Sequence, residues 1–184
     1  MTIDKTEAAA ALDDISRVIA NVKQSRIYQT SASMMMLWGA IVATGYLFAF
    51  FVPFRAAIGW LVLQVAGTLL TIAASVRWGS RQGRGGAEWR FGALMVLILL
   101  FGTLWAVVLG HFAPREMNVF WPTLFMFCYC VAGLWFGGAF TALGLGITAL
   151  SIAGYFWAGG WLEPYMAVVD GGGLVLCGLL MRRA

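Results

Sequence analysis

The stretch MNVFWPTLFMFCYCVAGLWFGGAFTALGLGITALSIAGYFWAGGWL, residues 117–162, contains 46 consecutive residues without a charged side chain or a histidine. One continuous α-helix of this length would extend about 70 Å, because each residue adds about 1.5 Å. That is about twice the hydrocarbon thickness of a bilayer. We therefore expect this stretch to cross a membrane twice, with the reversal in its glycine-rich part, FGGAFTALGLG (136–146).

The rest of the chain has the same apolar character. Hydrophobic residues make up 61% of the 184 residues and charged residues only 11%, whereas about a quarter of the residues in soluble proteins are charged. Three further charge-free runs, 27–54, 56–76 and 91–110, are each long enough to span a bilayer. The sequence predicts an all-α, polytopic membrane protein with six transmembrane helices, at about 33–53, 56–76, 91–112, 119–138, 142–160 and 164–181. The six helices form one transmembrane domain, residues 33–184, preceded by a cytoplasmic amphipathic helix and linker, residues 1–32.

The positions of Lys and Arg predict the orientation. If the N-terminus is inside, ten of the twelve basic residues lie on the inner side, and only Arg55 and Arg115 lie outside. Cytoplasmic loops carry an excess of Lys and Arg. We expect a multi-pass protein of a bacterial inner (plasma) membrane with both termini in the cytoplasm. The basic loop GSRQGRGG (79–86) follows from this topology, and no nucleic-acid partner is predicted.

The segment 4–26 has the features of an amphipathic helix. Its acidic residues come first and its basic residues later, which suits the helix dipole, and four apolar residues share one face: Leu12, Ile15, Ile19 and Val22. One interpretation is a helix that lies on the inner membrane surface or against the protein's own loops. The other is a docking or dimerising helix for a partner protein.

A short internal similarity relates helices 2, 4 and 6. When Gly67, Gly133 and Gly173 are aligned, Gln64, Cys130 and Asp170 fall at one position. This similarity predicts three helix hairpins, each made of an outward and a returning helix. Small residues let membrane helices approach closely, and the predicted helix-packing glycines are Gly67, Gly133, Gly137, Gly171, Gly172 and Gly173. Packing within one subunit and packing between subunits of a homo-oligomer both remain open.

Asp170 is the one carboxylate inside a predicted span, in AVVDGGGLVLCGLL (167–180). An ionised Asp at the middle of a membrane costs about 3 kcal/mol on insertion scales and less toward the interface. From the predicted helix boundaries, Asp170 lies about two turns from the outer end of helix 6. We expect it to face the bundle interior or a watery cleft, with Gln64, Tyr155, His111 or Arg115 as candidate partners. It is either a hydrogen-bonded group that fixes helix packing or a site for a proton, cation or polar solute.

The sequence predicts no catalytic residues, no cofactor and no metal site. His111 is the only histidine, and one histidine does not make a typical zinc or haem site. Cys128 and Cys130 point to different sides of a helix, so this pair does not chelate one ion. The sequence motifs of metalloproteases, P-loop proteins, α/β-hydrolases and dinucleotide-binding folds are absent.

The opening SASMMMLWGAIVATGY (31–46) and the closing YMAVVDGGGLVLCGLLMRRA (165–184) resemble the ends of small six-span bacterial inner-membrane proteins of uncharacterised activity. The three-hairpin layout is also similar to that of acid-resistance membrane proteins of enteric bacteria, without a shared motif. The resemblance implies a six-span fold and brings no activity or site residues.

Two functions fit these observations. In the first, the protein is a non-catalytic accessory or regulatory component that binds a cytosolic or membrane protein partner through residues 1–26 and the 77–90 loop. In the second, it is a small, oligomeric transporter or channel for a proton, cation or polar solute, with Asp170 in the pathway.

Overall fold

The computed structural model describes residues 28, 29, 31–79 and 88–183. Within these residues it contains helices and turns but no strands. Six helices are long and apolar enough to cross a membrane: Ser31–Phe51, Pro53–Ala74, Gly92–Leu109, Pro114–Phe136, Gly138–Trp157 and Gly159–Arg182. The predicted fold class, an all-α polytopic membrane protein with six spans, is confirmed. The predicted N-terminal amphipathic helix, with Leu12, Ile15, Ile19 and Val22, lies outside the described residues.

The helical elements follow the spans closely. The Ser31–Phe51 helix, here called the first span, is followed by α2 (Ala56–Gly79), α3 (Glu88–Thr103), α4 (Pro114–Phe136), α5 (Gly138–Trp157), α6 (Leu162–Met166) and α7 (Gly173–Arg183). The π-helical turn η2 (Leu104–Leu109) extends α3, and a second π-helical turn, η4 (Ala167–Gly172), joins α6 to α7 in the sixth span.

Two helix boundaries differ from the predicted ones for identifiable reasons. The predicted reversal between spans four and five is a single residue, Gly137, whose φ of 123° is open mainly to glycine. In addition, α4 begins five residues earlier than the predicted position 119. Pro114 fits the first turn of a helix, and the Glu116 carboxylate accepts a hydrogen bond from the Ala113 amide at 2.7 Å.

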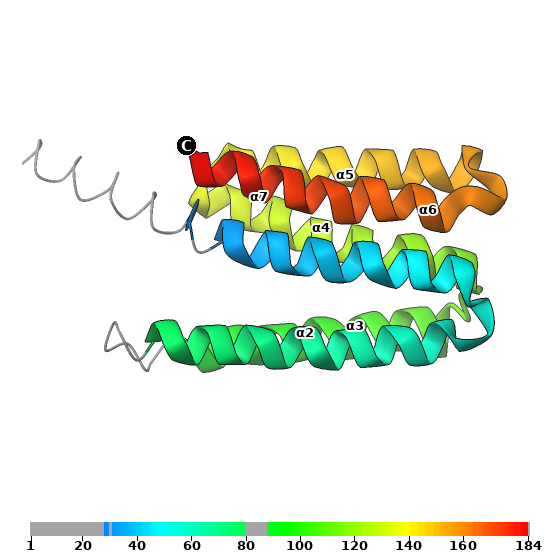
Figure 1. Cartoon of the computed structure of the whole chain (residues 1–184), viewed down its shortest axis with the longest axis horizontal. Coiled ribbons are helices and arrows are strands. Elements are labelled where there is room, and N and C mark those ends of the chain that lie inside the picture. The colour runs from blue at the N-terminus through cyan, green and yellow to red at the C-terminus, as the bar shows by residue number, and fades with distance from the viewer. Residues whose placement is uncertain (1–27, 30, 80–87, 184) are drawn as a thin grey trace, which may run out of the picture.

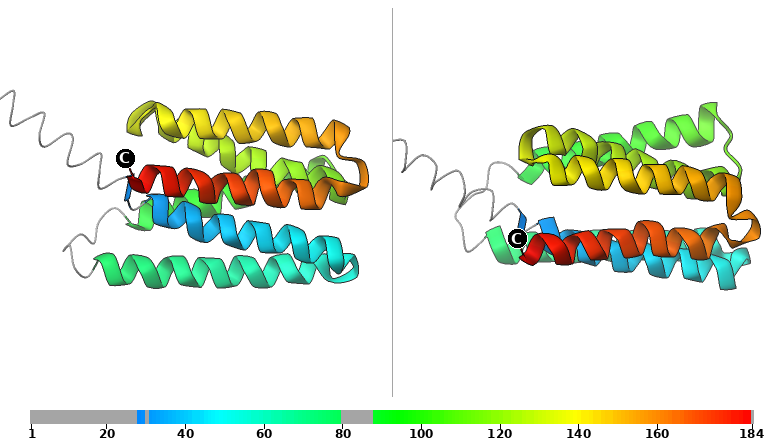
Figure 2. Two further views of the ribbon diagram at one scale, coloured as in Figure 1. Left: turned by 45° about the horizontal axis from the view of Figure 1, so that its top comes forward. Right: turned by 90° about the horizontal axis from the view of Figure 1, so that it is seen from above.

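The spans form two layers of three helices (Figures 1 and 2). The first span, α2 and the α6–α7 helix lie in one layer, and α3, α4 and α5 lie in the other. Trp38 of the first span donates a hydrogen bond to Thr71 of α2 at 3.2 Å. In the other layer, Gly102 of α3 lies against Trp121 of α4, and α4 and α5 pack along much of their length. Successive spans α2 and α3 therefore belong to different layers.

The two ends of the bundle differ in what they carry. The end with the turns at 52–55, 110–113 and 158–161 is here called the loop end. The described chain begins and finishes at the opposite end, here called the terminal end (Figure 1). The six spans place the first and the last described residues at the same end of the bundle.

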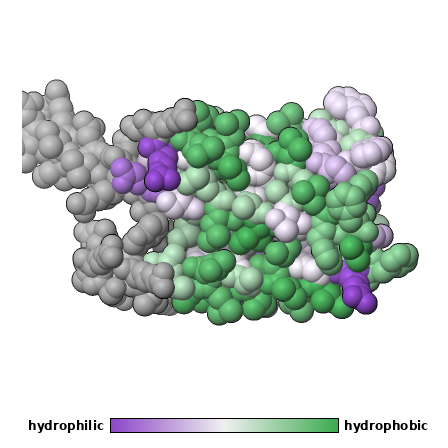
Figure 3. Space-filling view, in the orientation of Figure 1, coloured by the Kyte–Doolittle hydropathy of each residue, from purple (hydrophilic) through white to green (hydrophobic). Residues whose placement is uncertain are grey.

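The outer surface of the bundle is apolar. Figure 3 shows hydrophobic residues across the middle of the visible face and strongly hydrophilic residues near its two ends. Large side chains on α2 and α3 are among the most exposed, such as Leu61 at 65% and Phe101 at 63%. Such a belt is stable in contact with lipid hydrocarbon, which agrees with a multi-pass membrane protein.

The core lies between the first span, α4, α5 and the α6–α7 helix, and it consists of two apolar clusters. The larger one occupies the terminal half of the bundle and contains Ala32, Met35, Met126, Phe140, Leu143, Ile147, Leu174 and Met181. The smaller one occupies the loop half and contains Tyr46, Leu162, Met166 and Ala167. The level between these clusters holds the candidate site.

Candidate functional site

Asp170 lies in η4, eleven residues after the start of the sixth span at Gly159 and twelve before its end at Arg182. The first three of these residues, Gly159–Trp161, form the 3-10 turn at the loop end, so Asp170 is eight residues, about two helical turns, from the start of α6 at Leu162. This is the depth that the sequence analysis expects. The Asp170 side chain is 3% exposed. The prediction that it faces the bundle interior agrees with this burial.

The sequence around Asp170 explains how the carboxyl is placed. A π-helical turn widens the helix locally, and such turns are frequent at functional sites. Gly171 follows directly, and a Cβ atom there would lie 2.7 Å from the backbone nitrogen of Ala43 in the first span. Only a residue without a side chain permits this approach. The Asp-Gly pair therefore brings the first span tightly against the turn that carries the carboxyl.

Ser151 of α5 lies at the same level as Asp170. Along α5 it falls between Ile147, which packs on Gly173, and Gly154, which packs on Tyr165. Ser151 is completely buried. The Oγ atom of Ser151 and the Oδ1 atom of Asp170 are the two buried side-chain oxygens in the described chain that have no hydrogen-bond partner. The two apolar clusters are thus separated by a level with two unpartnered oxygen atoms.

Two tyrosines flank this level. Tyr46 of the first span belongs to the same cluster as Met166 and Ala167, about one turn before Asp170, and Tyr129 of α4 packs against the same cluster as Val169, the residue before Asp170. Tyr46 is 2% exposed and belongs to the loop-half cluster, whereas Tyr129 packs against the terminal-half cluster and stacks on Phe140. The sequence analysis did not select these tyrosines or Ser151 as site residues. The only sequence signal was a hydroxyl in an otherwise apolar helix, and several other residues share that signal.

The predicted partners of Asp170 occupy other parts of the bundle. His111 is exposed in the turn after η2, with a φ of 48°. Gln64 is half-buried on α2, and α2 packs on the Trp38 and Ile41 side of the first span. Tyr155 lies at the loop end of α5, where its carbonyl accepts a hydrogen bond from Arg115. Arg115 is therefore occupied by backbone carbonyls at the loop end.

Arg115 joins α4 to the end of α5. Its guanidinium donates to the carbonyls of Tyr155 at 2.7 Å and Gly159 at 3.0 Å, and it lies 5.5 Å from the centre of the Tyr155 ring. Carbonyls at a helix C-terminus lack intrahelical partners and carry partial negative charge. The Arg115 guanidinium thus pairs with one carbonyl in the last turn of α5 and one in the turn that follows, and fixes the loop end of α5.

Replacing this side chain is expected to loosen the loop end. Arg115→Ala should lower the free energy of unfolding by about 1 kcal/mol, since an exposed cation at a helix C-terminus contributes an amount of that order. Arg115→Lys should retain only part of this stabilisation, because an ammonium group lacks the planar guanidinium fork that reaches two carbonyls. Thermal unfolding in detergent micelles tests this order, and a lysine variant as stable as the wild type would contradict the two-carbonyl role.

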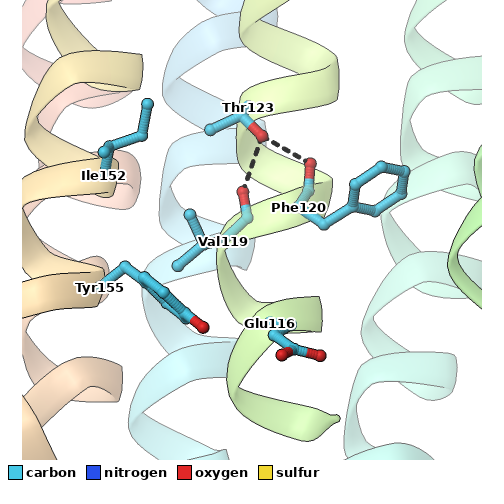
Figure 4. Close-up of a pocket in the computed structure, with 6 residues that line it drawn as sticks. All are labelled: Glu116, Val119, Phe120, Thr123, Ile152 and Tyr155. Atoms are coloured by element: carbon cyan, nitrogen blue, oxygen red, sulfur yellow. Dashed lines mark hydrogen bonds between the residues drawn. The ribbon is translucent and has the colours of Figure 1, made fainter. Parts of the chain in front are cut away.

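A shallow groove runs between α4 and α5 near the loop end (Figure 4). It has a volume of ≈ 240 Å³ and is lined by Glu116, Val119, Phe120, Thr123, Ile152 and Tyr155. The Thr123 hydroxyl is hydrogen-bonded to the carbonyls of Val119 and Phe120. Asp170 is not among the lining residues. The groove is therefore an apolar surface feature separate from the buried carboxyl.

The predicted packing glycines have different surroundings. Gly67 lies against Trp38 and Ile41, Gly173 against Ile147, and Gly133 against the backbone of Thr141. Gly133 thus contacts α5, the following span, whereas Gly67 and Gly173 each contact the preceding one. Gly137 is the turn residue between α4 and α5, so Gly133 and Gly137 do not form a continuous helical GxxxG face. A Cβ on Gly172 would have only its own helix within 4 Å.

Comparison with known proteins found no matching family model, no matching curated protein and no matching solved structure.

Proposed function

We propose that this protein is a small membrane transporter or channel in which Asp170 binds a proton or a small cation on its way across the membrane. The single observation that carries the proposal is the unpartnered Asp170 Oδ1 atom, buried inside a membrane span about two helical turns from the start of α6. A carboxyl at this depth is costly, and a structural carboxyl normally has its hydrogen bonds satisfied. A buried carboxyl oxygen without a hydrogen-bond partner is suited to a ligand that binds and dissociates.

The surroundings favour a small ligand over a larger polar solute. Asp170 is 3% exposed, and the next residue, Gly171, packs against the backbone of Ala43. The groove at the loop end does not include Asp170. A site enclosed in this way accepts a proton or an ion after small side-chain movements. Passage of a solute with many atoms would require the helices to separate.

The other hypothesis, an accessory protein that binds a cytosolic or membrane partner, depends on residues 1–26 and on the 77–90 loop. Residues 1–27 and 80–87 are outside the described chain. Burial and contacts therefore offer that hypothesis no support, and it stays a prediction.

The test is ion flux with and without the carboxyl. The full chain is reconstituted into liposomes that contain a pH-sensitive dye, and a potassium diffusion potential is imposed. The wild type should carry protons inward, and Asp170→Asn should reduce this flux at least about tenfold, because a positioned proton-transfer group contributes at least that much. Parallel assays with sodium and with potassium identify a cation if protons are not carried.

The matched control is Glu116→Gln, which makes the same carboxyl-to-amide change at an exposed position and keeps an oxygen acceptor for the Ala113 amide. It should leave the flux unchanged. Equal proton, sodium and potassium flux in the wild type and Asp170→Asn would remove the proposal.

A further inference from the structure

A row of polar groups connects the loop end with the buried carboxyl. Starting at the loop end, the Asn118 side chain donates to Glu163 Oε1 at 3.2 Å. The Tyr46 hydroxyl donates to the Asn118 carbonyl at 2.7 Å. Tyr46 is one helical turn from Ala43, against which Gly171 packs, and it shares a buried cluster with Met166 and Ala167, so it lies beside the turn that carries Asp170. These four residues are here called the polar column: Glu163, Asn118, Tyr46 and Asp170.

The polar column is built from three separate elements. Glu163 and Asp170 lie seven residues apart on the sixth span, Glu163 in α6 and Asp170 in the π-helical turn η4. Asn118 comes from α4 and Tyr46 from the first span. Glu163 and Asn118 are half-buried, whereas Tyr46 and Asp170 are buried. Exposure therefore decreases from the loop end toward the carboxyl.

On the terminal side of Asp170 the core is apolar. Met35, Met126, Ile147 and Leu174 are each at most 4% exposed and belong to one packed cluster. The titratable groups that pack against this cluster are Tyr28, Tyr129 and Cys177, and the Tyr129 ring stacks on Phe140. Moving a charge through such a cluster is costly because apolar side chains offer it no hydrogen bonds. The two sides of the carboxyl therefore differ sharply in polarity.

The number of available oxygen atoms bears on the identity of the ligand. Hard divalent cations take about six to eight oxygen ligands, and potassium filters surround the ion with rings of carbonyls. Two buried side-chain oxygens lack a partner at the Asp170 level. Nowhere in the described residues do three His, Cys, Asp or Glu side chains gather closely enough to hold a metal ion. A proton requires one oxygen atom only.

We infer that the ligand of Asp170 is a proton, that it enters from the loop end along the polar column, and that Tyr46 controls its passage. This inference rests on the proposed function and deepens it. The Tyr46 hydroxyl donates its hydrogen to the Asn118 carbonyl. The row of hydrogen bonds is therefore interrupted between Tyr46 and Asp170. A protonated water that enters between these two residues transfers its proton to Asp170 Oδ1: the O–H bond of the hydronium breaks as the carboxyl O–H bond forms. Return of the proton to the loop end is the same step in reverse.

The experiment measures how quickly the Asp170 carboxyl exchanges its proton for deuterium. Time-resolved infrared spectroscopy of the full chain in lipid follows the C=O band of the protonated carboxyl after transfer into D₂O, at a pH at which the band is present. Asp170→Asn identifies the band by its absence. The readout needs no flux, so failure of transport and failure of the loop-end route are distinguishable.

Three changes on the polar column have defined outcomes. Tyr46→Phe keeps the ring, which packs at 5.1 Å from the Trp60 ring, but removes the hydroxyl, and exchange should slow about tenfold or more. Tyr46→Ser removes the ring and leaves a hydroxyl, so water should enter and exchange should become faster than in the wild type. Glu163→Gln keeps an acceptor for Asn118 and should give a rate between those of the wild type and Tyr46→Phe.

The matched control is Tyr129→Phe, which removes a phenol hydroxyl on the terminal side of Asp170 and should leave the exchange rate unchanged. Slower exchange in Tyr129→Phe with wild-type exchange in Tyr46→Phe would place the route on the terminal side and overturn the inference. Unchanged exchange in Tyr46→Phe, Tyr46→Ser and Glu163→Gln together would overturn it as well. Glu163→Gln still tests the route if a Tyr46 variant fails to fold.

Discussion

Gly171→Ala is expected to lower the free energy of unfolding by about 2–3 kcal/mol. The new methyl group would lie 2.7 Å from the backbone nitrogen and 2.8 Å from the Cα atom of Ala43. Backbone atoms do not rotate away as a side chain does, so the first span and the sixth span must move apart. Overpacking of a tight interface typically costs about 1–3 kcal/mol, and a rigid neighbour favours the upper part of this range.

The adjacent glycine provides the control for this change. In Gly172→Ala the added methyl group has no neighbour within 4 Å other than a carbonyl of its own helix. Alanine favours a helix over glycine by up to about 1 kcal/mol, so this variant should be as stable as the wild type or slightly more stable. Thermal unfolding in detergent micelles compares the two. Equal stability of Gly171→Ala and Gly172→Ala would show that the first span is not held against the Asp170 turn.

The Gly171 contact also links stability to the site. Because Gly171 sits beside Asp170, separation of the two spans would open the buried level to water. We therefore expect Gly171→Ala to speed deuterium exchange of the Asp170 carboxyl, while Gly172→Ala leaves the rate unchanged.

Gly144→Ala is expected to destabilise the α4–α5 interface by about 2 kcal/mol. A Cβ atom at this position would lie 2.6 Å from the carbonyl oxygen of Met126 and 3.0 Å from the amide nitrogen of Cys130. The Cys130 Sγ atom also lies 2.5 Å from this Cβ position, and the two helices share the most extensive contact among the labelled elements. Small residues at such positions allow membrane helices to pack closely, and an added methyl group forces them apart.

Gly146→Ala is the matched control on the same helix. Gly146 is exposed and has nothing within 4 Å of an added Cβ atom, so the substitution should leave the unfolding temperature unchanged or raise it slightly. A loss of stability in Gly146→Ala equal to that in Gly144→Ala would indicate a partner on the lipid-facing side of α5. In that case the contact with α4 would not be the cause.

The sequence by itself determined the class of protein and the number of spans. Charge-free runs mark the helices because an unpaired charge is costly in hydrocarbon, and this rule operates along the chain without reference to tertiary contacts. The same rule selected Asp170, which is the one carboxylate far from any span end. It also located the reversal within 136–146, since glycine is favoured where the backbone adopts positive φ.

Only the tertiary structure decided which groups surround Asp170. Tyr46, Tyr129 and Ser151 lie on three different helices, and a hydroxyl on a membrane helix carries no sign of the direction in which it points. Helix rotation and the assignment of spans to two layers are set by close contacts such as those of Gly171 with Ala43 and Gly133 with Thr141. Such contacts depend on the complementary shapes of segments that are distant in the sequence. The hydropathy of one segment contains no information about which segments will be its neighbours.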